Sequence, residues 1–269
     1  MKIIQDKKRL IKLIQGEKNL GFVPTMGTIH LGHISLINKC ISLCDKTVVS
    51  IYVNKPQFNK SKDFSNYPRN LKKDIKILKK LNVDYLYTPI TKQIYPKGIN
   101  KKIKISSFSK KLCGKFRQGH FESVVDVIDR FVKIIDPKYI FLGEKDYQQL
   151  KIVEHFLNKN HKNIKLVPCK TIREKNGIAY SSRNTLLSPK QKKVAAKIYN
   201  LIHHKKKYLI KKKIHLNIIK NKIHYFGIQK IDYIKILDVN KLTKPYLKKV
   251  KYRIFLAYYL NGVRLIDNI

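Results

Sequence analysis

The chain has 269 residues, a formal net charge of +42 and 43% hydrophobic residues. This length suffices for one large domain or two ordinary ones, and the apolar share is enough to bury a core, so a disordered chain is excluded. No stretch of about 18 consecutive apolar residues occurs, and charges interrupt the apolar positions at the start of the chain, which argues against a transmembrane helix and a signal peptide. We therefore expect a soluble, cytoplasmic protein with no membrane partner.

The high positive charge is spread along the whole chain. Lysines accompany many isoleucines and asparagines, and tryptophan is absent. This pattern is typical of compositional drift in an AT-rich genome, whereas a dedicated nucleic-acid surface more often combines arginines with aromatic residues. We expect weak, salt-sensitive binding to nucleic acid but no specific nucleic-acid partner, and an increased local concentration of anions such as ATP.

The four cysteines give no sign of a disulfide framework or a zinc site. None of them forms a C-x-x-C pair. Cys40 and Cys44 are four residues apart in a helical pattern, which places them on one helix face and favours ordinary core packing.

The first 170 residues alternate between short apolar runs and amphipathic segments. Strands are predicted over residues 20–24, 47–53, 84–88, 138–142 and 164–169. Helices are predicted over residues 31–44, 71–81, 121–135 and 146–157. Helical spacing predicts that the first of these helices faces the core with Leu31, Ile34, Ile37 and Ile41. Strands that alternate with helices indicate βαβ units, a parallel sheet covered on both faces, and ligands at the carboxyl ends of the strands.

The pattern changes after about residue 185. Helices are predicted over residues 188–211 and 216–226, and strands over residues 231–237, 253–260 and 263–266. The expected fold is α/β, with a Rossmann-like parallel-sheet N-terminal domain over residues 1–175 and a smaller α+β C-terminal domain over residues 176–269.

The segment PTMGTIHLGH at residues 24–33 is the most informative. A strand ends at Pro24, a glycine turn follows, and a helix begins near His30, whose first N–H groups are unpaired and favour an anion. His30 and His33 share one face of the first turn, and Gly32 permits close approach of a ligand. The pattern predicts a polyphosphate pocket. A metal site is an alternative, although no third ligand lies nearby. Two further alternatives are that the histidines are ordinary polar groups at a helix start, and that the H-x-G-H pattern is a chance match.

The segment GEKDYQQL at residues 143–150 follows a predicted strand directly and therefore lies at the same sheet edge. Lys145 offers a point charge for phosphate, and Asp146 is suited to cap the next helix. Gln148 and Gln149 suit a hydroxyl or a carboxylate. An ordinary charged turn between strand and helix is the alternative.

Three further segments add polar groups. YSSRN at residues 180–184 combines two hydroxyls with an arginine, which predicts an anion-binding cluster or, alternatively, a helix N-cap region. VNKPQFN at residues 53–59 places Asn54 and Gln57 at the carboxyl end of a predicted strand. FRQGHFESVV at residues 116–125 leads through a Gly-His turn into an amphipathic helix.

In order and spacing these segments resemble the pantothenate synthetases. The segments that carry the resemblance are PTMGTIHLGH, SIYVNKPQFN, DFSNYPRNLKKD, RQGHFESVVDVI, FLGEKDYQQL, IREKNGIAYSSRN, IDYIKILD and NGVRLIDN. They span nearly the whole chain, and as a set they are highly specific, although H-x-G-H is shared by a wider class of nucleotidyltransferases.

The resemblance implies ATP-dependent condensation of (R)-pantoate with β-alanine through pantoyl adenylate, with Mg²⁺, a homodimer and a C-terminal lid over ATP. Residues implied at ATP are Met26, Gly27, Thr28, Ile29, His30, Leu31, Gly32, His33, Gly143, Glu144, Lys145, Asp146, Ile172, Tyr180, Ser181, Ser182 and Arg183. Residues implied at the other substrates are Gln57, Gln149 and Asn54. The residues implied to stabilise the reacting phosphates are His33, also as proton donor, and His30, Lys145 and Arg183. The Mg²⁺ ligands stay unassigned, with Asp74 as a candidate.

Four positions depart from the family's usual residues: Leu31, Lys55, Gln118 and Tyr180. We expect Leu31 to face the core harmlessly, Lys55 to change slightly the turn that aims Gln57, and Tyr180 to alter packing near ATP. None removes a catalytic group.

Two other classes of function compete with this interpretation. A nucleotidyltransferase that transfers AMP to a phosphorylated precursor would share the H-x-G-H helix start, but it would need a second basic cluster in place of Gln57 and Gln149. A nucleic-acid-binding protein would show tight, salt-sensitive binding that survives mutation of His33.

Overall fold

The computed structural model describes residues 1–211, 213–239 and 251–269. These residues form two compact units. The first consists of Met1–Glu144 and Gln148–Thr171, and the second of Lys145–Tyr147 and Ile172–Ile269. Each unit has its own sheet and is described by itself.

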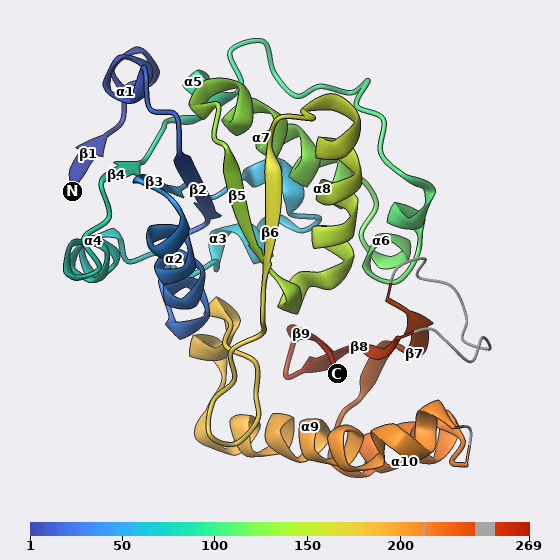
Figure 1. Ribbon diagram of the computed structural model, residues 1–269. Helices are drawn as coiled ribbons and strands as arrows, with labels where there is room; N and C mark the ends of the chain where they lie inside the picture. The colour runs from blue at the N-terminus through green and yellow to red at the C-terminus, as the bar shows by residue number, and fades with distance from the viewer. Residues whose placement is uncertain (212, 240–250) are drawn as a thin grey trace. The chain divides into compact units, whose positions relative to one another are not determined.

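The first unit is built on a parallel sheet of six strands, in the order β1-β4-β3-β2-β5-β6 (Figure 1). The strands are β1 (Lys2–Ile4), β2 (Leu20–Thr25), β3 (Lys46–Ile51), β4 (Tyr85–Tyr87), β5 (Tyr139–Gly143) and β6 (Lys165–Cys169). β2 lies at the point where the strand order changes side: β3 pairs with it on one side and β5 on the other, all in parallel. The loops after β2, β3 and β5 therefore lie at one edge, where open parallel sheets bind ligands.

Helices connect the strands of this sheet. They are α1 (Lys7–Ile14), α2 (Leu31–Leu43), η1 (Lys55–Gln57), α3 (Ser61–Ser65), α4 (Leu71–Lys80), α5 (Thr91–Ile94), η2 (Ser107–Lys110), α6 (Cys113–Phe116), α7 (His120–Ile135), η3 (Glu144–Asp146) and α8 (Tyr147–Asn160).

Alternating side chains of the strands bury both faces of the sheet. Val23 of β2 packs in one cluster with Ile37 of α2 and Leu78 of α4. Its neighbour Phe22 points to the other face, where its ring centroid lies 5.5 Å from that of Phe131 in α7. Layers of helix on both faces of a parallel sheet confirm the predicted Rossmann-like α/β fold.

The prediction for the core face of α2 was partly wrong. Ile37 is fully buried, but Leu31 and Ile41 are 51% and 38% exposed. Leu31 is the first residue of the helix, and it does not belong to the buried cluster that Ile37 and Cys40 form. Cys40 and Cys44 are buried instead, as expected for core packing.

Some elements were not predicted from the sequence. β1 has only three residues and pairs with β4 at the edge of the sheet. α1 follows it, with Leu10 and Ile14 buried. The alternation of charged and apolar residues in this segment argued against a signal peptide, but it is also the pattern of a short amphipathic helix.

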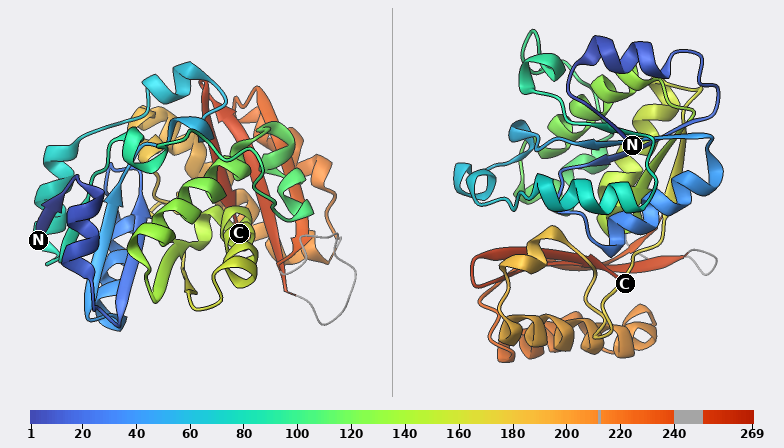
Figure 2. Two further views of the ribbon diagram at one scale, coloured as in Figure 1. Left: turned by 90° about the horizontal axis from the view of Figure 1, so that it is seen from above. Right: turned by 90° about the vertical axis from the view of Figure 1, so that its left-hand side faces the viewer.

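The second unit is a three-stranded antiparallel sheet, in the order β7-β8-β9, with two long helices. Its elements are η4 (Ser182–Leu186), α9 (Pro189–Ile210), α10 (Leu216–Tyr225), β7 (Lys230–Asp238), β8 (Tyr252–Leu260) and β9 (Val263–Asn268). Figure 2 shows α9 and α10 lying along one face of this sheet. Ser188 and Gln191 form a capping box that starts α9. The predicted α+β character is confirmed, and none of the helices in the described residues is long and apolar enough to span a bilayer.

Candidate active site

The turn between β2 and α2 has a backbone that only certain residues adopt. Gly27 and Thr28 have φ values of +81° and +54°. A Cβ atom at position 27 would lie 3.0 Å from Oδ2 of Asp74. Glycine is therefore needed at position 27, both for its positive φ and for the close approach of a carboxylate.

Asp74 fixes this turn from the first turn of α4. Its carboxylate oxygens accept hydrogen bonds from the N–H groups of Thr28 at 2.8 Å and Ile29 at 2.7 Å. The residue is 1% exposed, and charge-assisted bonds of this kind are among the strongest in proteins. Because two backbone donors already occupy the carboxylate, the geometry favours a structural role for Asp74 over metal ligation.

His30 and His33 lie at the N-terminus of α2. His30 is the N-cap residue, and its Nδ1 accepts a hydrogen bond of 3.4 Å from the N–H of His33. The two imidazole rings stack, with centroids 3.9 Å apart. An accepting Nδ1 leaves the proton of a neutral ring on Nε2. The first N–H groups of the helix, at Leu31 and Gly32, have no intrahelical acceptor and favour an anion at this point.

Gln57 lies at the end of η1, directly after β3. Its Nε2 is 2.9 Å from Sδ of Met26, and its Oε1 accepts a hydrogen bond of 3.2 Å from Nδ2 of Asn54. Asn54 itself is 1% exposed, and its carboxamide also bonds Tyr95 and the carbonyl of Ser123. The structure thus brings Met26 and Gln57 together and commits the Asn54 carboxamide to internal bonds.

Two residues hold the main chain at Gln57. Its carbonyl oxygen accepts from Nη2 of Arg117 at 3.1 Å and from Nδ1 of His120 at 2.9 Å. Nη1 of Arg117 lies 2.9 Å from Nε2 of His120. An arginine only donates, so Nε2 of His120 accepts and Nδ1 carries the proton. The sequence drew attention to the Arg-Gln-Gly-His turn but gave no indication of these contacts.

Gln148 and Gln149 have different environments, although they are neighbours on α8. Gln148 is 5% exposed, and its Oε1 accepts from the N–H of Cys113 while its Nε2 donates to the carbonyls of Phe108 and Lys111. Gln149 is half-buried. Gln148 therefore holds the loop before α7, and the substrate role of the Gln149 carboxamide stays a prediction.

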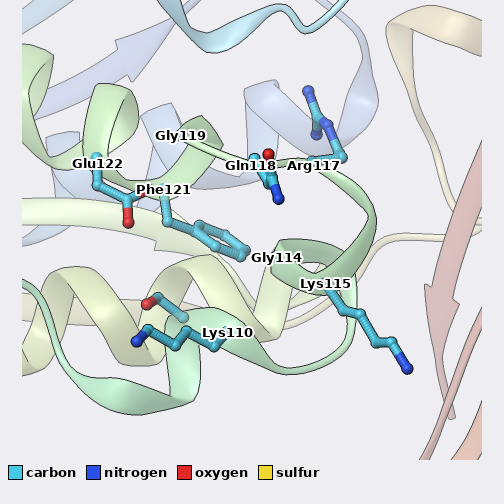
Figure 3. Close-up of a pocket in the computed structure, with 9 residues that line it drawn as sticks. Lys110, Gly114, Lys115, Arg117, Gln118, Gly119, Phe121 and Glu122 are labelled. Carbon is cyan, nitrogen blue, oxygen red and sulfur yellow. The ribbon is translucent and has the colours of Figure 1, made fainter.

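That loop borders a cavity of about 400 Å³. Figure 3 shows its lining residues, which come from η2, α6, the turn between α6 and α7, and the start of α7. The lining residues are Ser109, Lys110, Gly114, Lys115, Arg117, Gln118, Gly119, Phe121 and Glu122. None of the predicted site residues is among these, and Arg117, which donates to the carbonyl of Gln57, links the cavity to the site.

Burial sets the protonation of the side chains beneath the site. Burial raises the pKa of the Tyr95 hydroxyl well above its usual value, with a smaller contribution from Asp126. Burial likewise raises the pKa of the Cys40 thiol to about 12 and that of the Cys169 thiol to about 11. At neutral pH these groups are protonated, so Tyr95 is a hydrogen-bond donor and the two cysteines are poor nucleophiles.

The predicted ATP residues at the end of β5 divide between the two units. Gly143 and Glu144 belong to the first unit, and Lys145 and Asp146 to the second. Nζ of Lys145 lies 3.5 Å from Oδ1 of Asp146, and its carbonyl accepts a hydrogen bond of 2.9 Å from Nδ2 of Asn268. The described residues hold no group of three or more His, Cys, Asp or Glu side chains arranged for a metal ion.

In the second unit, the structure brings Ile172 and Tyr180 together. The N–H of Tyr180 donates to the carbonyl of Ile172 at 3.0 Å, beside a bridge between Arg173 and Ala179. Oγ of Ser181 accepts from the N–H of Arg183 at 3.3 Å. Ser181 is the N-cap of η4, whose first two residues are Ser182, which is buried, and Arg183, which is half-buried; Tyr180 directly precedes the cap.

The comparisons with known proteins cover the whole chain. The family model described as pantoate-beta-alanine ligase matches residues 1–269. The pantothenate synthetase of Flavobacterium psychrophilum is 39% identical over 272 residues, which are 98% of this chain and 96% of that protein. The pantothenate synthetase of Clostridium botulinum is 38% identical, with the same coverage of both chains.

Two solved structures have the same architecture. Pantothenate synthetase from Thermus thermophilus matches with a TM-score of 0.89 at 28% identity, covering 100% of this chain and 99% of that one. Pantoate-beta-alanine ligase from Francisella tularensis, complexed with beta-gamma ATP and beta-alanine, matches with a TM-score of 0.87 at 37% identity, covering 100% and 97%. The fold defines a Rossmann-like α/β protein that has, besides its parallel sheet, a smaller antiparallel sheet. The chain belongs to the pantoate–β-alanine ligase family.

Proposed function

We propose that the chain condenses (R)-pantoate with β-alanine in two half-reactions, through a pantoyl-adenylate intermediate. The overall reaction, ATP-dependent ligation of pantoate to β-alanine, is that of the family whose model matches residues 1–269, and this full-length match carries the proposal. In the first half, a pantoate carboxylate oxygen attacks the α-phosphorus of ATP and pyrophosphate leaves. In the second, the amine of β-alanine attacks the acyl carbonyl and AMP leaves.

The turn before α2 supports the first half-reaction. The stacked rings of His30 and His33 stand beside the first N–H groups of the helix, which carry the positive end of its dipole. In phosphoryl chemistry the protein mainly positions the substrates and stabilises charge on the phosphate oxygens. His33 is proposed to donate a proton or a hydrogen bond to these oxygens, and His30 to orient His33.

Gln57 and Gln149 are the proposed pantoate contacts. Both offer neutral carboxamides, which suit the hydroxyl and carboxylate oxygens of pantoate without adding a competing charge. Asn54 is proposed to act through Gln57 rather than by direct contact, because its own carboxamide is buried in internal bonds.

Mg²⁺ is proposed to enter with ATP as part of that substrate. Mg²⁺ usually keeps several waters and binds through phosphates with one or two carboxylates rather than in an all-protein cage. The described residues fit this mode, since they hold no cluster of three metal-binding side chains and the Asp74 carboxylate is occupied by two N–H groups.

Further roles stay predictions. They are ATP contacts from Met26, Gly27, Thr28, Ile29, Leu31, Gly32, Gly143, Glu144, Lys145, Asp146, Ile172, Tyr180, Ser181, Ser182 and Arg183. A lid formed by residues 176–269, a homodimer and a cytoplasmic location are also predictions. Variants of Lys145 and Arg183, assayed for ATP affinity, test the two charged contacts.

An isotope experiment tests the intermediate. Pantoate labelled with ¹⁸O in its carboxylate is turned over with ATP and β-alanine, and the products are analysed by mass spectrometry. Attack by the carboxylate on the α-phosphorus predicts one ¹⁸O atom in AMP, since the bridging oxygen leaves with it. Formation of ADP, with the label in orthophosphate, would contradict an adenylate and indicate an acyl phosphate.

A further inference from the structure

Tyr95 occupies a position beneath Gln57 that the predicted site does not account for. It follows α5, is 8% exposed, and its Oη lies 2.8 Å from Oδ1 of Asn54 in a buried hydrogen bond. Only the Asn54 side chain thus lies between the Tyr95 hydroxyl and the Gln57 carboxamide proposed to contact pantoate.

The Tyr95 ring packs against a well-anchored arginine. The guanidinium of Arg130 lies 4.4 Å from the centre of the ring. Arg130 is itself fixed by Asp126 at 2.7 Å and by the carbonyls of Ile94 and Gly98 at 2.8 and 2.9 Å. These two carbonyls flank Tyr95 in the sequence. Arg130 of α7 therefore contacts both the Tyr95 ring and the main chain on either side of it.

The direction of the hydrogen bond between Tyr95 and Asn54 follows from a third partner. The carbonyl of Ser123 only accepts, and it lies 3.2 Å from one end of the Asn54 carboxamide, which must therefore be Nδ2. The other end is Oδ1, and it faces Tyr95, so the hydroxyl of Tyr95 must donate.

The orientation of Asn54 in turn fixes that of Gln57. The second hydrogen on Nδ2 of Asn54 is donated to Oε1 of Gln57 at 3.2 Å. The NH₂ group of Gln57 then points to the Met26 sulfur, 2.9 Å away. Sulfur is a weak acceptor, so a substrate oxygen replaces it at little cost.

From this chain of bonds we propose that Tyr95 is a positioning residue. By donating to Oδ1 it holds Asn54 in the orientation that the Ser123 carbonyl sets, and it thereby keeps Gln57 a hydrogen-bond donor toward an acceptor oxygen of pantoate. The opposite orientation of both carboxamides would present Oε1 of Gln57 and repel the carboxylate of pantoate. The inference rests on the proposed function, because it assigns a direction to the Gln57 contact of that reaction.

The test compares two single-hydroxyl deletions. Tyr95→Phe removes the donor to Asn54. Tyr87→Phe is the matched control, since Tyr87 in β4 is 0% exposed and its hydroxyl has no hydrogen-bond partner in the part of the chain that the structure describes. Tyr95→Phe is expected to raise the KM for pantoate about tenfold, the value of one hydrogen bond, with kcat and the KM for ATP changed less than about twofold. Tyr87→Phe is expected to leave all three constants unchanged.

The outcomes separate this inference from the reaction itself. Wild-type protein that makes no pantothenate would refute the proposed function. Active wild-type protein with an unchanged pantoate KM in Tyr95→Phe would overturn the role of Tyr95. Equal losses in kcat, pantoate KM and ATP KM would also overturn it, because a merely structural residue has that effect.

An NMR measurement on the unaltered protein applies if Tyr95→Phe does not fold. The side-chain NH₂ signals of Gln57 are identified by their absence from the Gln57→Ala spectrum. With a non-hydrolysable ATP analogue present, pantoate is expected to shift these signals downfield, as donation to a substrate oxygen replaces contact with sulfur. Signals that do not move on saturation with pantoate would overturn the inference.

Discussion

The turns after β2 and β3 lie at the same edge of the sheet but are held by opposite chemistry. The first is fixed by the carboxylate of Asp74, which accepts from two backbone N–H groups. The second is fixed by the carboxamide of Asn54, which accepts from Tyr95 and donates to Gln57 and Ser123. One support only accepts, and the other both accepts and donates.

The difference matches the ligand proposed for each turn. The Asp74 carboxylate accepts from two backbone N–H groups and leaves the next N–H groups, at the start of α2, for an anion. It introduces one buried negative charge, which these two hydrogen bonds stabilise. The Asn54 carboxamide adds no charge. It donates to Oε1 of Gln57, so that the NH₂ group of Gln57 is left to donate to a substrate that is itself a carboxylate. We expect the largest effects from changes in the first turn, smaller ones from changes in α8, and the smallest from the net charge of the whole chain.

Loss of the Asp74 carboxylate should damage the first turn most. Asp74→Ala leaves two buried N–H groups without an acceptor, and we expect the free energy of unfolding to fall by about 3 kcal/mol or more. Asp74→Asn keeps the shape but sets an NH₂ group against an N–H donor, so it should lose most of the ATP-dependent activity while retaining more stability. Denaturant unfolding and steady-state kinetics measure the two effects. Asp45→Asn, at an exposed carboxylate, is the control, and equal losses in it would refute the argument.

His33 should affect the reaction rather than the fold. His33→Ala is expected to lower kcat by about 10²-fold or more, as for the loss of a group that stabilises phosphate charge or donates a proton. His155→Ala on α8 provides a comparison at an exposed histidine outside the turn. An unchanged kcat in His33→Ala would remove His33 from the mechanism.

Gln149 of α8, like Gln57 of the second turn, should mainly determine the affinity for pantoate. Gln149→Ala is expected to raise the KM for pantoate about tenfold, while the KM for ATP changes little. Gln148→Ala should instead lower stability, because that carboxamide holds the loop at Phe108 and Lys111. A change in ATP affinity alone in Gln149→Ala would show that Gln149 is misassigned.

The smallest effect concerns the whole chain. A net charge of +42 should destabilise the compact state by self-repulsion. Between about 0.01 M and 0.15 M ionic strength the Debye length falls from about 30 Å to about 8 Å, so the melting temperature should rise. A gain of ~1 kcal/mol corresponds to about 2–4 °C for a chain of this size. Two salts at equal ionic strength separate screening from ion binding, and a flat melting temperature would contradict the prediction.

The sequence located both turns, because glycine, proline and histidine mark them locally. Helical and strand periodicity predicted five of the six strands of the parallel sheet, together with α2, α7 and the long helix α9, to within a few residues; only the short edge strand β1 was missed. Leu31 was misassigned to the core, since helical spacing does not show where the sheet beneath a helix ends.

The side chains that hold the two turns in place could not be predicted from the sequence. Asp74 lies 46 residues from Thr28, and Tyr95 lies 41 residues from Asn54. Bonds between such distant residues depend on how helices and loops pack on the sheet, and no local pattern encodes that packing. For the same reason Gln148 and Gln149 looked equivalent until their environments were compared.

The most direct test of the proposed mechanism is exchange of labelled pyrophosphate into ATP with β-alanine absent. The account predicts exchange that requires pantoate, is lost in His33→Ala, and is followed by AMP release once β-alanine is added. Exchange without pantoate, or none at all by folded wild-type protein that still forms pantothenate, would contradict an adenylate made from pantoate in a separate first step.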